Sequence, residues 1–378
     1  MFNNNDRPGI MLSNSVKKYL DFYGVSCGFN NVIFTNNDSA YETAVSLKEK
    51  GISVEMIDIR KKSNSKIVKN AEQLGVKIYW NSTVVNTFGL RKINSVEIMN
   101  LSEDGSNVVG EKNRINCDCL AISGGWTPMV HMHTQSGGKL DFREIDQTFI
   151  PNEIDKNHIN VGSCNGDFEL EEIINNTNKK VKNFLKVSET EFDNTYVLNS
   201  KELDKRNIWL LPNYISEGKC KSFIDFQNDS TAKDIKLALR EGFKSIEHVK
   251  RYTTTGMATD QGKLSNMHAL GIIADTAGVK MGTLGTTTFR PPFTPLTFGS
   301  IVGRSVGNFF DIMRKTSIHE WHIQNNAKFE NVGQWKRPWY YPIDDEDLHD
   351  AVQRESKAAR DSAGILDAST LGKIDIQA

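Results

Sequence analysis

The sequence has few cysteines, and none of them lies in a paired motif. Their number is odd, and no Cys-x-x-Cys pair occurs. Scattered, unpaired cysteines are typical of free thiols in a reducing compartment. We therefore expect a cytoplasmic protein without a disulfide framework. The five cysteines are Cys27, Cys117, Cys119, Cys164 and Cys220.

Long apolar runs and an excess of one charge are also absent. No stretch of about 18 apolar residues is present, so no transmembrane helix is predicted. Residues 1–8 have neither the basic nor the apolar region of a signal peptide. The net charge of −1 excludes a general attraction to nucleic acid or to an anionic membrane. We expect neither of these as a partner.

A glycine-rich phosphate turn is missing where one is expected. The spacing of apolar residues predicts a buried strand over 31–34, a helix over 40–50 and a second strand over 54–58. Dinucleotide-binding folds usually place glycines in the turn after the first strand, so that backbone N–H groups approach the pyrophosphate. Here the turn is filled by Asn36, Asn37, Asp38 and Ser39.

Two interpretations of this turn stay open. Asn and Asp tolerate left-handed backbone and cap helices, so the turn can form around Asn37. Asp38 would repel a phosphate, which favours an ordinary α/β turn. Asp58, however, ends the second strand, where an acid that binds the ribose is expected. A nucleotide site that uses Asn37 and Asp58 and a plain α/β turn are both retained.

The composition that is present belongs to a globular protein of several domains. Hydrophobic residues make up 38% and charged residues 25%, which is enough apolar surface for real cores. A length of 378 residues indicates two or three domains. Further predicted elements are a helix over 11–24, a β-meander from 76 to 101 with turns at Gly105 and Gly110, strands over 118–123, 159–162 and 371–378, a helix over 168–187, a polar linker over 188–218 and a helix-rich unit over 220–275.

Two of these strands deliver glycines at their carboxyl ends, where α/β sheets bind ligands. After the β-α-β unit and the meander, this order resembles the two-dinucleotide-domain flavoproteins, the pyridine nucleotide–disulfide oxidoreductases. We place this region, lacking its N-terminal part, at 1–190. The redox cysteine pair of that family is absent, so thiol–disulfide exchange is not expected. The candidate cofactor-binding residues are Gly124, Gly125 and Trp126 after the first strand, and Gly162, Asn165 and Gly166 after the second.

The next region, 191–285, reads as a linker followed by a module similar to the small iron–sulfur modules of amine and opine oxidases. The positions that match its cluster ligands, within 224–229 and 256–263, carry no cysteine, so a cluster cannot form. We expect no metal. The hydroxyls and cations left at the turn suit a phosphate, such as that of FMN, and a solvated basic loop remains the alternative. These residues are Lys250, Arg251, Thr254, Thr255, Gln261 and Lys263.

The last region, 286–378, resembles the opening of the aminomethyltransferase (glycine-cleavage T-protein) fold, an α+β domain that binds tetrahydrofolate. The resemblance rests on residues 334–340, a helix over 350–363 and residues 366–374. A Pro-rich linker, Arg290–Pro295, leads into it. We expect Asp367 to be structural, and leave the catalytic residues unassigned.

The order of these three regions resembles the alpha subunits of heterotetrameric sarcosine oxidases. The regions are a dinucleotide-type half, a cysteine-free ferredoxin-like module and the start of an aminomethyltransferase domain. The phrases that carry the resemblance are Phe223–Asp229, Thr231–Ile235, His248–Met257 and Thr286–Pro292. The resemblance implies a fragment truncated at both ends, with a first glycine-rich fingerprint before Met1 and most of a folate domain after Ala378.

The resemblance also implies a reaction. Sarcosine is oxidised in a beta subunit, electrons pass to O2 through FMN shared with that subunit, and the methyl carbon reaches tetrahydrofolate as 5,10-methylenetetrahydrofolate. It further implies bound NAD and gamma and delta partners. Two alternatives remain: a self-contained FAD/NADH-dependent oxidoreductase, and a non-catalytic subunit that holds cofactors. A stand-alone glycine-cleavage protein fits less well, because some 280 residues precede that fold.

Overall fold

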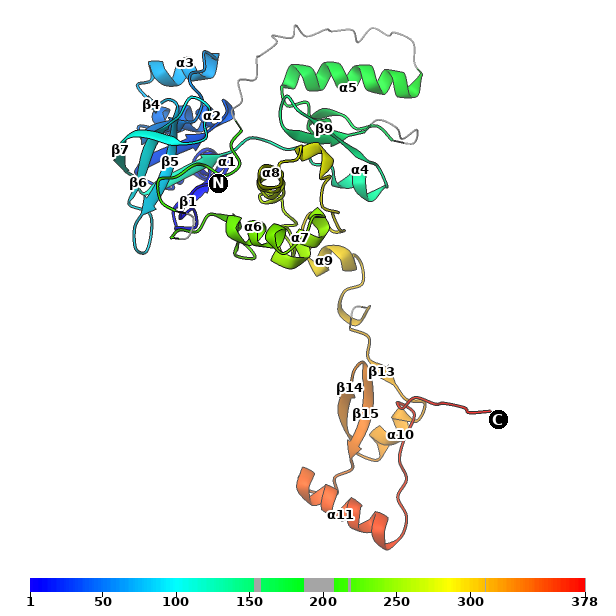
Figure 1. The fold of residues 1–378 in the computed structure, drawn as a ribbon. Helices are drawn as coiled ribbons and strands as arrows, with labels where there is room; N and C mark the ends of the chain where they lie inside the picture. The colour runs from blue at the N-terminus through cyan, green and yellow to red at the C-terminus, as the bar shows by residue number, and fades with distance from the viewer. Residues whose placement is uncertain (153–157, 187–206, 217–218, 310, 378) are drawn as a thin grey trace. The chain divides into compact units, whose positions relative to one another are not determined.

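The computed structural model describes residues 1–152, 158–186, 207–216, 219–309 and 311–377. The chain forms two compact units, Met1–Thr294 and Pro295–Ala378 (Figure 1). Each unit has its own sheets and helices and is described separately below. The predicted domain boundaries at 190/191 and 285/286 stay predictions.

A five-stranded parallel sheet forms the centre of the first part of unit 1. Its strands lie in the order β1-β8-β2-β3-β4, and every neighbouring pair is parallel. β2 and β3 are almost continuously buried, as expected for strands covered on both faces. The predicted α/β class is confirmed. The strands are β1 (Ile10–Leu12), β2 (Asn30–Thr35), β3 (Ser53–Asp58), β4 (Lys77–Tyr79) and β8 (Cys119–Ser123).

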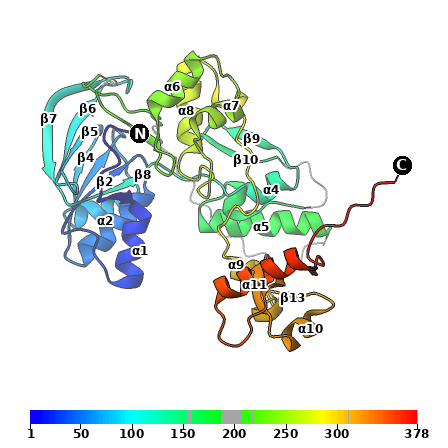
Figure 2. The same ribbon diagram turned by 90° about the horizontal axis from the view of Figure 1, so that it is seen from below.

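Two different layers cover this sheet, because its strands present alternate side chains to opposite faces. Ile33, Met56 and Ala121 pack against the helices, in a core with Leu47 and Val16. The other face packs against the antiparallel meander, as Figure 2 shows. The helices are α1 (Ser13–Tyr23), α2 (Ser39–Glu49) and α3 (Lys66–Gln73), and the meander strands are β5 (Ser82–Phe88), β6 (Ser95–Leu101) and β7 (Val108–Asn116).

The meander confirms one predicted turn and corrects the other. Gly105 lies between β6 and β7, as predicted for a hairpin. Gly110 lies inside β7 instead, with φ of +79°. Asn100 pairs with Val109 while Ile98 pairs with Asn113, so extra residues bulge out of β7 at this glycine. A bulge and a turn use the same left-handed glycine, which is why the sequence did not separate them.

Two further predictions about local structure need correction. The helix predicted over 11–24 begins at Ser13, because Ile10–Leu12 form β1 beside β8; its end at Gly24, with φ of +62°, is confirmed. The strand predicted over 159–162 does not form. Residues 158–161 are not part of any strand, and Gly162, with φ of +67°, starts a short 3-10 turn, η1 (Gly162–Asn165).

The rest of unit 1 contains a hairpin that the sequence did not reveal and a helical module that it did. The core of the module includes Phe149 of the hairpin. Asp234 accepts hydrogen bonds from Thr231 N–H and Oγ–H at the start of the helix Ala232–Arg240. The elements are α4 (His131–Gln135), β9 (Leu140–Arg143), β10 (Thr148–Pro151), α5 (Leu170–Leu185), β11 (Phe223–Asp225), β12 (Ser230–Thr231), α6 (Ala232–Arg240), α7 (Ile246–Thr253), α8 (Asn266–Ala277) and η2 (Met281–Thr283).

Part of the predicted linker over 188–218 packs into the protein. Residues 187–206 and 217–218 lie outside the described residues. In the described stretch 207–216, Leu211 joins the core beneath the meander, while Trp209 packs against the core of the module. A Cβ on Gly271 of α8 would lie 2.1 Å from the Trp209 ring, so only glycine admits this contact. The segment therefore joins two cores.

Unit 2 has a small mixed α+β fold. Its sheet order is β13-β15-β14. Asp347 caps α11 by accepting hydrogen bonds from His349 N and Asp350 N. The strand predicted over 371–378 is wrong for the described residues 371–377, which contain no strand. The elements are α9 (Phe298–Val302), η3 (Gly307–Phe309), β13 (Arg314–Lys315), α10 (His319–Gln324), β14 (Lys328–Val332), β15 (Trp335–Tyr340) and α11 (Leu348–Asp361).

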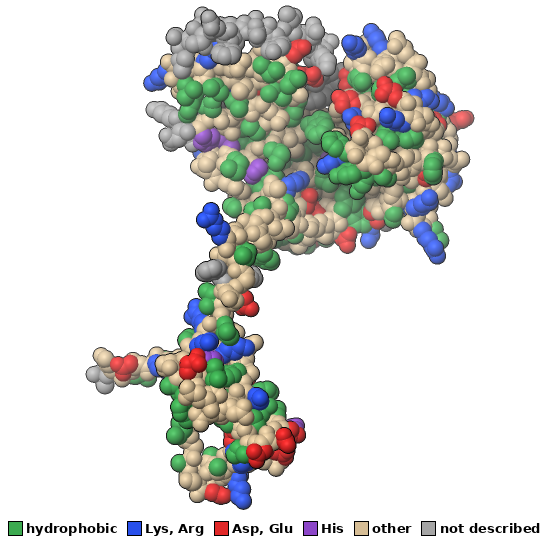
Figure 3. All heavy atoms as spheres, turned by 180° about the vertical axis from the view of Figure 1, so that it is seen from behind, with side chains coloured by type: hydrophobic (Ala, Val, Ile, Leu, Met, Phe, Trp, Pro, Cys, Tyr) green, Lys and Arg blue, Asp and Glu red, His purple; other side chains and the backbone are tan. Residues whose placement is uncertain are grey.

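The surface and the helices agree with the charge and hydropathy patterns. On the face drawn in Figure 3, Lys and Arg side chains lie among Asp and Glu side chains over unit 1, whereas acidic side chains gather at one place on unit 2. Within the described part of the chain, every helix is too short or too polar to cross a membrane.

The buried face of α2 provides a test of this packing. Leu47 is fully buried, whereas Leu90 is 98% exposed. We expect Leu47→Ala to lower the free energy of unfolding by about 2–5 kcal/mol, because it removes buried methyl groups and leaves a cavity. Leu90→Ala, the same change on the surface, should alter it by less than about 0.5 kcal/mol. Urea unfolding measures both, and equal effects would contradict the described core.

Candidate functional site

The carboxyl edge of the parallel sheet brings together four of the residues predicted to bind a cofactor. β2 and β8 are parallel neighbours, paired from Asn31 with Cys119 onward. The turn after β2 therefore lies beside the segment after β8. Asn37 Nδ2 lies 3.1 Å from Ser123 Oγ. Gly124 and Gly125 follow directly, and the indole of Trp126 donates to Ser39 Oγ at 2.9 Å. Asn37, Gly124, Gly125 and Trp126 thus share one edge.

The polar groups of the turn are used within the protein. Asn37 Oδ1 accepts hydrogen bonds from Ser39 N at 3.1 Å and from Ser39 Oγ at 2.5 Å. Asn37 N donates to Thr35 Oγ1. Asparagine therefore does here, with its side chain, what an anion does at a glycine-rich turn. The N–H group at the start of α2 is already satisfied.

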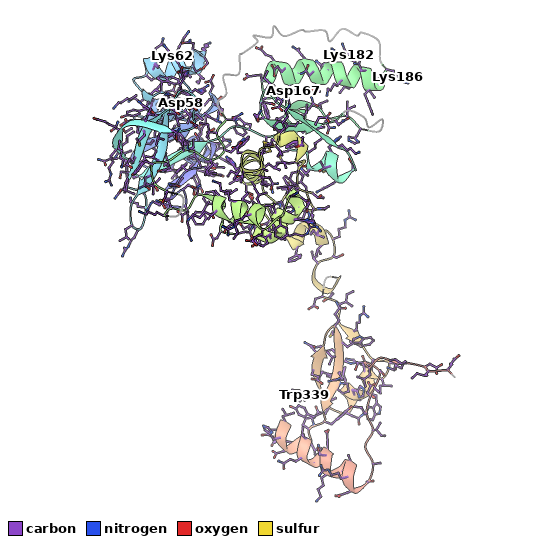
Figure 4. The ribbon with its side chains drawn as sticks, in the orientation of Figure 1. Asp58, Lys62, Asp167, Lys182, Lys186 and Trp339 are labelled. Atoms are coloured by element: carbon purple, nitrogen blue, oxygen red, sulfur yellow. The ribbon has the colours of Figure 1, made fainter. Side chains whose placement is uncertain are left out.

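Asp58, predicted to bind a ribose, is fully buried at the end of β3 (Figure 4). Its carboxylate accepts hydrogen bonds from Tyr41 Oη at 2.9 Å and from Arg60 Nη2 at 2.8 Å. Arg60 also pairs with Asp38 at 2.8 Å. Burial and the neighbouring Asp58 charge raise the pKa of Tyr41. The cluster holds β3 to the turn, and it neutralises the Asp38 charge that would repel a phosphate.

The second predicted glycine turn lies beside α5. Gly166 O accepts a hydrogen bond from Arg143 Nη2 at 2.8 Å, and Arg143 is paired with Asp146. Asn165 Oδ1 accepts one from Lys180 Nζ at 2.9 Å. Gly162 opens the turn, and Figure 4 labels Asp167 next to it. These hydrogen bonds link Gly166 to Arg143 of β9 and Asn165 to Lys180 of α5, and none of them joins Gly162, Asn165 or Gly166 to the sheet edge.

The residues predicted to bind a phosphate in the helical module hold a segment of backbone instead. We call residues 286–293 the strap. Gln261 Nε2 donates to Arg290 O at 2.8 Å, and its Oε1 accepts from Arg290 N at 2.8 Å. Lys263 Nζ donates to Phe293 O at 2.8 Å and lies 4.0 Å from the Phe293 ring centre. The side chains of this turn thus recognise main-chain atoms of the strap.

The remaining residues of that prediction divide between surface and interior. Lys250 Nζ lies 3.4 Å from Thr288 O; burial lowers the pKa of Lys250, and the charges of Arg290 and Arg251 add to this. Arg251 pairs with Glu247 at 3.0 Å. Thr254 caps α7 with φ of +60° and is exposed, whereas Thr255 is buried.

Sequence reasoning missed three residues that matter for these contacts. Arg60 follows Asp58 by two residues, and a basic residue so close to a buried acid was a usable signal. Glu247 accepts a hydrogen bond from Thr288 N at 2.7 Å. Burial lowers the pKa of His268 to about 4, and a Cβ on Gly124 would lie 3.6 Å from His268 Nε2. Nothing in the sequence links His268 to Gly124.

Unit 2 contains a buried hydrogen-bonded chain. His322 is 2% exposed; its Nε2 lies 2.9 Å from Asp367 Oδ2, and its Nδ1 lies 2.6 Å from Tyr341 Oη. Burial by itself would raise the pKa of Asp367, but hydrogen bonds from Ser369 and His322 outweigh it and lower that pKa. The chain ties α10 to the segments after β15 and α11.

The Arg60 cluster yields a stability prediction. Asp58→Asn leaves the buried Arg60 guanidinium without its main counter-charge, so we expect a loss of about 3–5 kcal/mol in unfolding free energy. Asp38→Asn, at the exposed end of the same arginine, should cost about 1 kcal/mol or less. Urea unfolding of both variants checks this. Equal losses would mean that Asp58 is not the main partner of Arg60.

The chain of Asp367, His322 and Tyr341 yields a pH prediction. The pKa of Asp367 is lower in the folded state than its unfolded value of about 3.9. Its stabilisation is therefore complete above that unfolded pKa and is lost as the pH falls through the folded pKa. Asp367→Asn should make amide-exchange protection of residues 319–324 less dependent on pH below about 4. Exposed Asp345→Asn is the control; if both variants keep the original pH dependence, Asp367 does not cause it.

Comparisons with known proteins identify two regions of the chain. The family model described as the sarcosine oxidase A3 domain matches residues 219–304, and that of the GCVT N-terminal domain matches residues 318–377. Among solved structures, L-proline dehydrogenase from P. horikoshii shares 16% identity and a TM-score of 0.46, over 79% of this chain and 55% of that one.

Two curated relatives align with the whole chain. The sarcosine oxidase subunit alpha of Corynebacterium sp. (strain U-96) is 39% identical over 100% of this chain and 40% of its own length. The subunit alpha of Rhizobium meliloti (strain 1021) is 33% identical over 100% of this chain and 37% of its own length. The chain thus spans about 40% of the length of the relatives it matches. With the A3 and GCVT matches in the same order, the chain belongs to the family of sarcosine oxidase alpha subunits.

Proposed function

We propose that this chain works as part of the alpha subunit of a multi-subunit sarcosine oxidase. The complex would convert sarcosine, O2 and tetrahydrofolate to glycine, H2O2 and 5,10-methylenetetrahydrofolate, with amine oxidation in a beta subunit and with gamma and delta subunits present. The observation that carries the proposal is the 39% sequence identity, over the whole chain, to a protein named as a sarcosine oxidase alpha subunit. The A3 and GCVT matches support the same order of domains.

NAD is the first cofactor of the proposal, and the sheet edge fits it only in part. Gly124 and Gly125 leave backbone open at the edge, and the half-exposed ring of Trp126 offers a flat apolar surface. The polar side-chain atoms of Asn37 and Asp58 are hydrogen-bonded within the protein. We therefore propose that these two residues hold the sheet edge in place and do not contact NAD themselves. Gly162, Asn165 and Gly166 are a second proposed contact. When bound, NAD would supply a redox-active nicotinamide.

FMN, shared with the beta subunit, is proposed to place its phosphate near the strap. Lys250, Arg251 and Lys263 would supply positive charge, and Thr254, Thr255 and Gln261 would supply hydroxyl and amide groups. The side chains of Thr254 and Arg251 are exposed, but Thr254 Oγ1 donates to Thr253 O and Arg251 pairs with Glu247, so a phosphate would have to share or replace these contacts. Gln261 and Lys263 hold the strap, so for them the fit requires the strap to move. Bound FMN would accept and pass on electrons.

Tetrahydrofolate is proposed as the ligand of the domain whose first part is unit 2. The support is the GCVT N-terminal match over 318–377. In the described residues, His322 fixes the position of Tyr341, and Asp367 fixes the imidazole of His322. The His322 and Asp367 side chains are buried, Tyr341 is half-buried, and together they organise the start of the domain. Bound folate would supply the acceptor nitrogens for the methyl carbon.

A non-catalytic subunit that holds cofactors is the second candidate. It is favoured by four side chains that are hydrogen-bonded within the protein and therefore have no evident role in a reaction. They are those of Asn37, Asp58, Gln261 and Lys263. Such a subunit would bind its partners and cofactors and turn over no amine alone. The self-contained FAD/NADH-dependent oxidoreductase lacks a comparable observation.

The decisive experiment uses the natural full-length chain co-expressed with its genomic neighbours. Heat release of NAD from the alpha subunit alone, with FMN only when beta is present, is expected, together with sarcosine-dependent H2O2 and methylenetetrahydrofolate. FAD released from alpha alone and reduced by NADH would favour the self-contained oxidoreductase instead. NAD and FMN without turnover by the complete complex would favour the scaffold.

Arg251→Gln tests the proposed phosphate contact. Loss of one charge-assisted contact should weaken FMN retention by about tenfold. Arg240→Gln, at the exposed end of α6 in the same module, is the matched control and should retain FMN. FMN content after dialysis, measured by absorbance, reports both. Equal FMN contents in the two variants would remove Arg251 from the site.

A further inference from the structure

Unit 1 contains a cavity of about 710 Å³ that is separate from the residues predicted to bind cofactors. The loop 208–216 forms one wall, and Gly105 and Ser106 of the β6–β7 turn lie beside it. The opposite wall comes from α6 and the end of α8. This volume is typical of a pocket for a small molecule. None of the fourteen residues predicted to bind cofactors lines it.

Much of the wall is apolar. Ile208, Leu210 and Ile215 contribute from the loop, and Ile272, which is 2% exposed, contributes from α8. Leu211 belongs to the core beneath the meander, so the wall is anchored on one side. Apolar side chains held by a packed core favour a ligand with an apolar body.

The polar groups of the wall favour an anion at one end of that ligand. Lys233 and Lys236 both line the cavity from α6, and their spacing of three residues puts them on one side of the helix. Asp275 is the one acid among the described lining residues, which gives these side chains a net charge of +1. Both lysines also make other interactions, which an incoming anion would share or exchange.

A buried amide supplies an independent sign of a missing partner. Asn3 lines the cavity and is only 8% exposed. Its Oδ1 accepts a hydrogen bond from Ser222 Oγ at 2.9 Å, but its Nδ2 has no partner among the described residues. A buried N–H group without an acceptor is costly. Because Nδ2 itself is buried, a rotation of the Asn3 side chain is needed before a ligand in the cavity can accept its hydrogen bond.

We propose that this cavity binds a small amphipathic carboxylate. Its carboxylate lies near Lys233, Lys236 and the amide of Asn3, and its apolar body lies against Ile208, Leu210 and Ile272. The proposal is independent of the proposed oxidase activity, because it uses none of those residues and no redox step.

Octanoate and its neutral analogue octanamide test the proposal by calorimetric titration of the full chain. We expect one saturable site that binds octanoate at least about tenfold more tightly than octanamide, because two ammonium groups face the carboxylate. Lys233→Gln combined with Lys236→Gln should abolish that preference and leave octanamide binding unchanged. Lys233→Arg with Lys236→Arg should keep it, because the charge is retained.

Two further variants keep the test decisive if the glutamine pair fails to fold. Ile208→Trp fills the cavity and should weaken both ligands, and exposed Lys244→Gln on the same module should weaken neither. Thermal melting shows which variants are folded. No saturable binding, no preference for the carboxylate, unchanged affinity for both ligands in folded Ile208→Trp, or an unchanged preference in the folded glutamine pair would each overturn the proposal.

Discussion

The placement of β8 between β1 and β2 is the constraint on which unit 1 depends. β8 pairs with β2 through five residues and with β1 through three, although more than eighty residues separate it from β2 in the chain. This pairing alone brings Gly124 and Trp126 to the turn that contains Asn37. It also gives the meander and the helices a common sheet to cover. The sheet edge therefore exists only when the most distant strand has arrived.

A second theme is the internal use of charge. Arg60 lies between two carboxylates, Gln261 and Lys263 bind main-chain atoms of the strap, and Asp367 orients His322. Side chains that look available in the sequence are committed once the chain folds, because a buried polar atom must find a partner. Cofactor binding near these residues would exchange existing contacts for new ones.

The sequence predicted the elements with strong periodicity and missed those defined by distant contacts. The strands over 31–34, 54–58 and 118–123 and the helices α2 and α5 are confirmed, because apolar runs and spacing signal them locally. β1 and the β9–β10 hairpin are short, and tertiary pairing rather than local pattern decides them. The strand predicted over 159–162 is wrong, because a local apolar pattern cannot show that this stretch has no strand to pair with among the described residues.

The candidate site was also predictable only where a local sequence pattern indicates it. The grouping of Gly124, Gly125 and Trp126 with Asn37 followed from the rule that ligands bind at carboxyl ends of parallel strands. The burial of Asp58 did not follow, because a ribose-binding acid and a structural acid occupy the same position at a strand end. The grip of Gln261 and Lys263 on the strap depends on residues thirty positions away, and no local pattern encodes it.

The position of β8 has a consequence for synthesis of the chain. A ribosome adds about 5–20 residues per second, so roughly 4–17 seconds pass between completion of β2 and emergence of β8. During that time the facing edges of β1 and β2 lack their common neighbour, and open strand edges are templates for wrong pairing. The nascent protein is therefore most exposed to misassociation before residue 119 leaves the ribosome, and a chaperone that shields β2 would act within this interval.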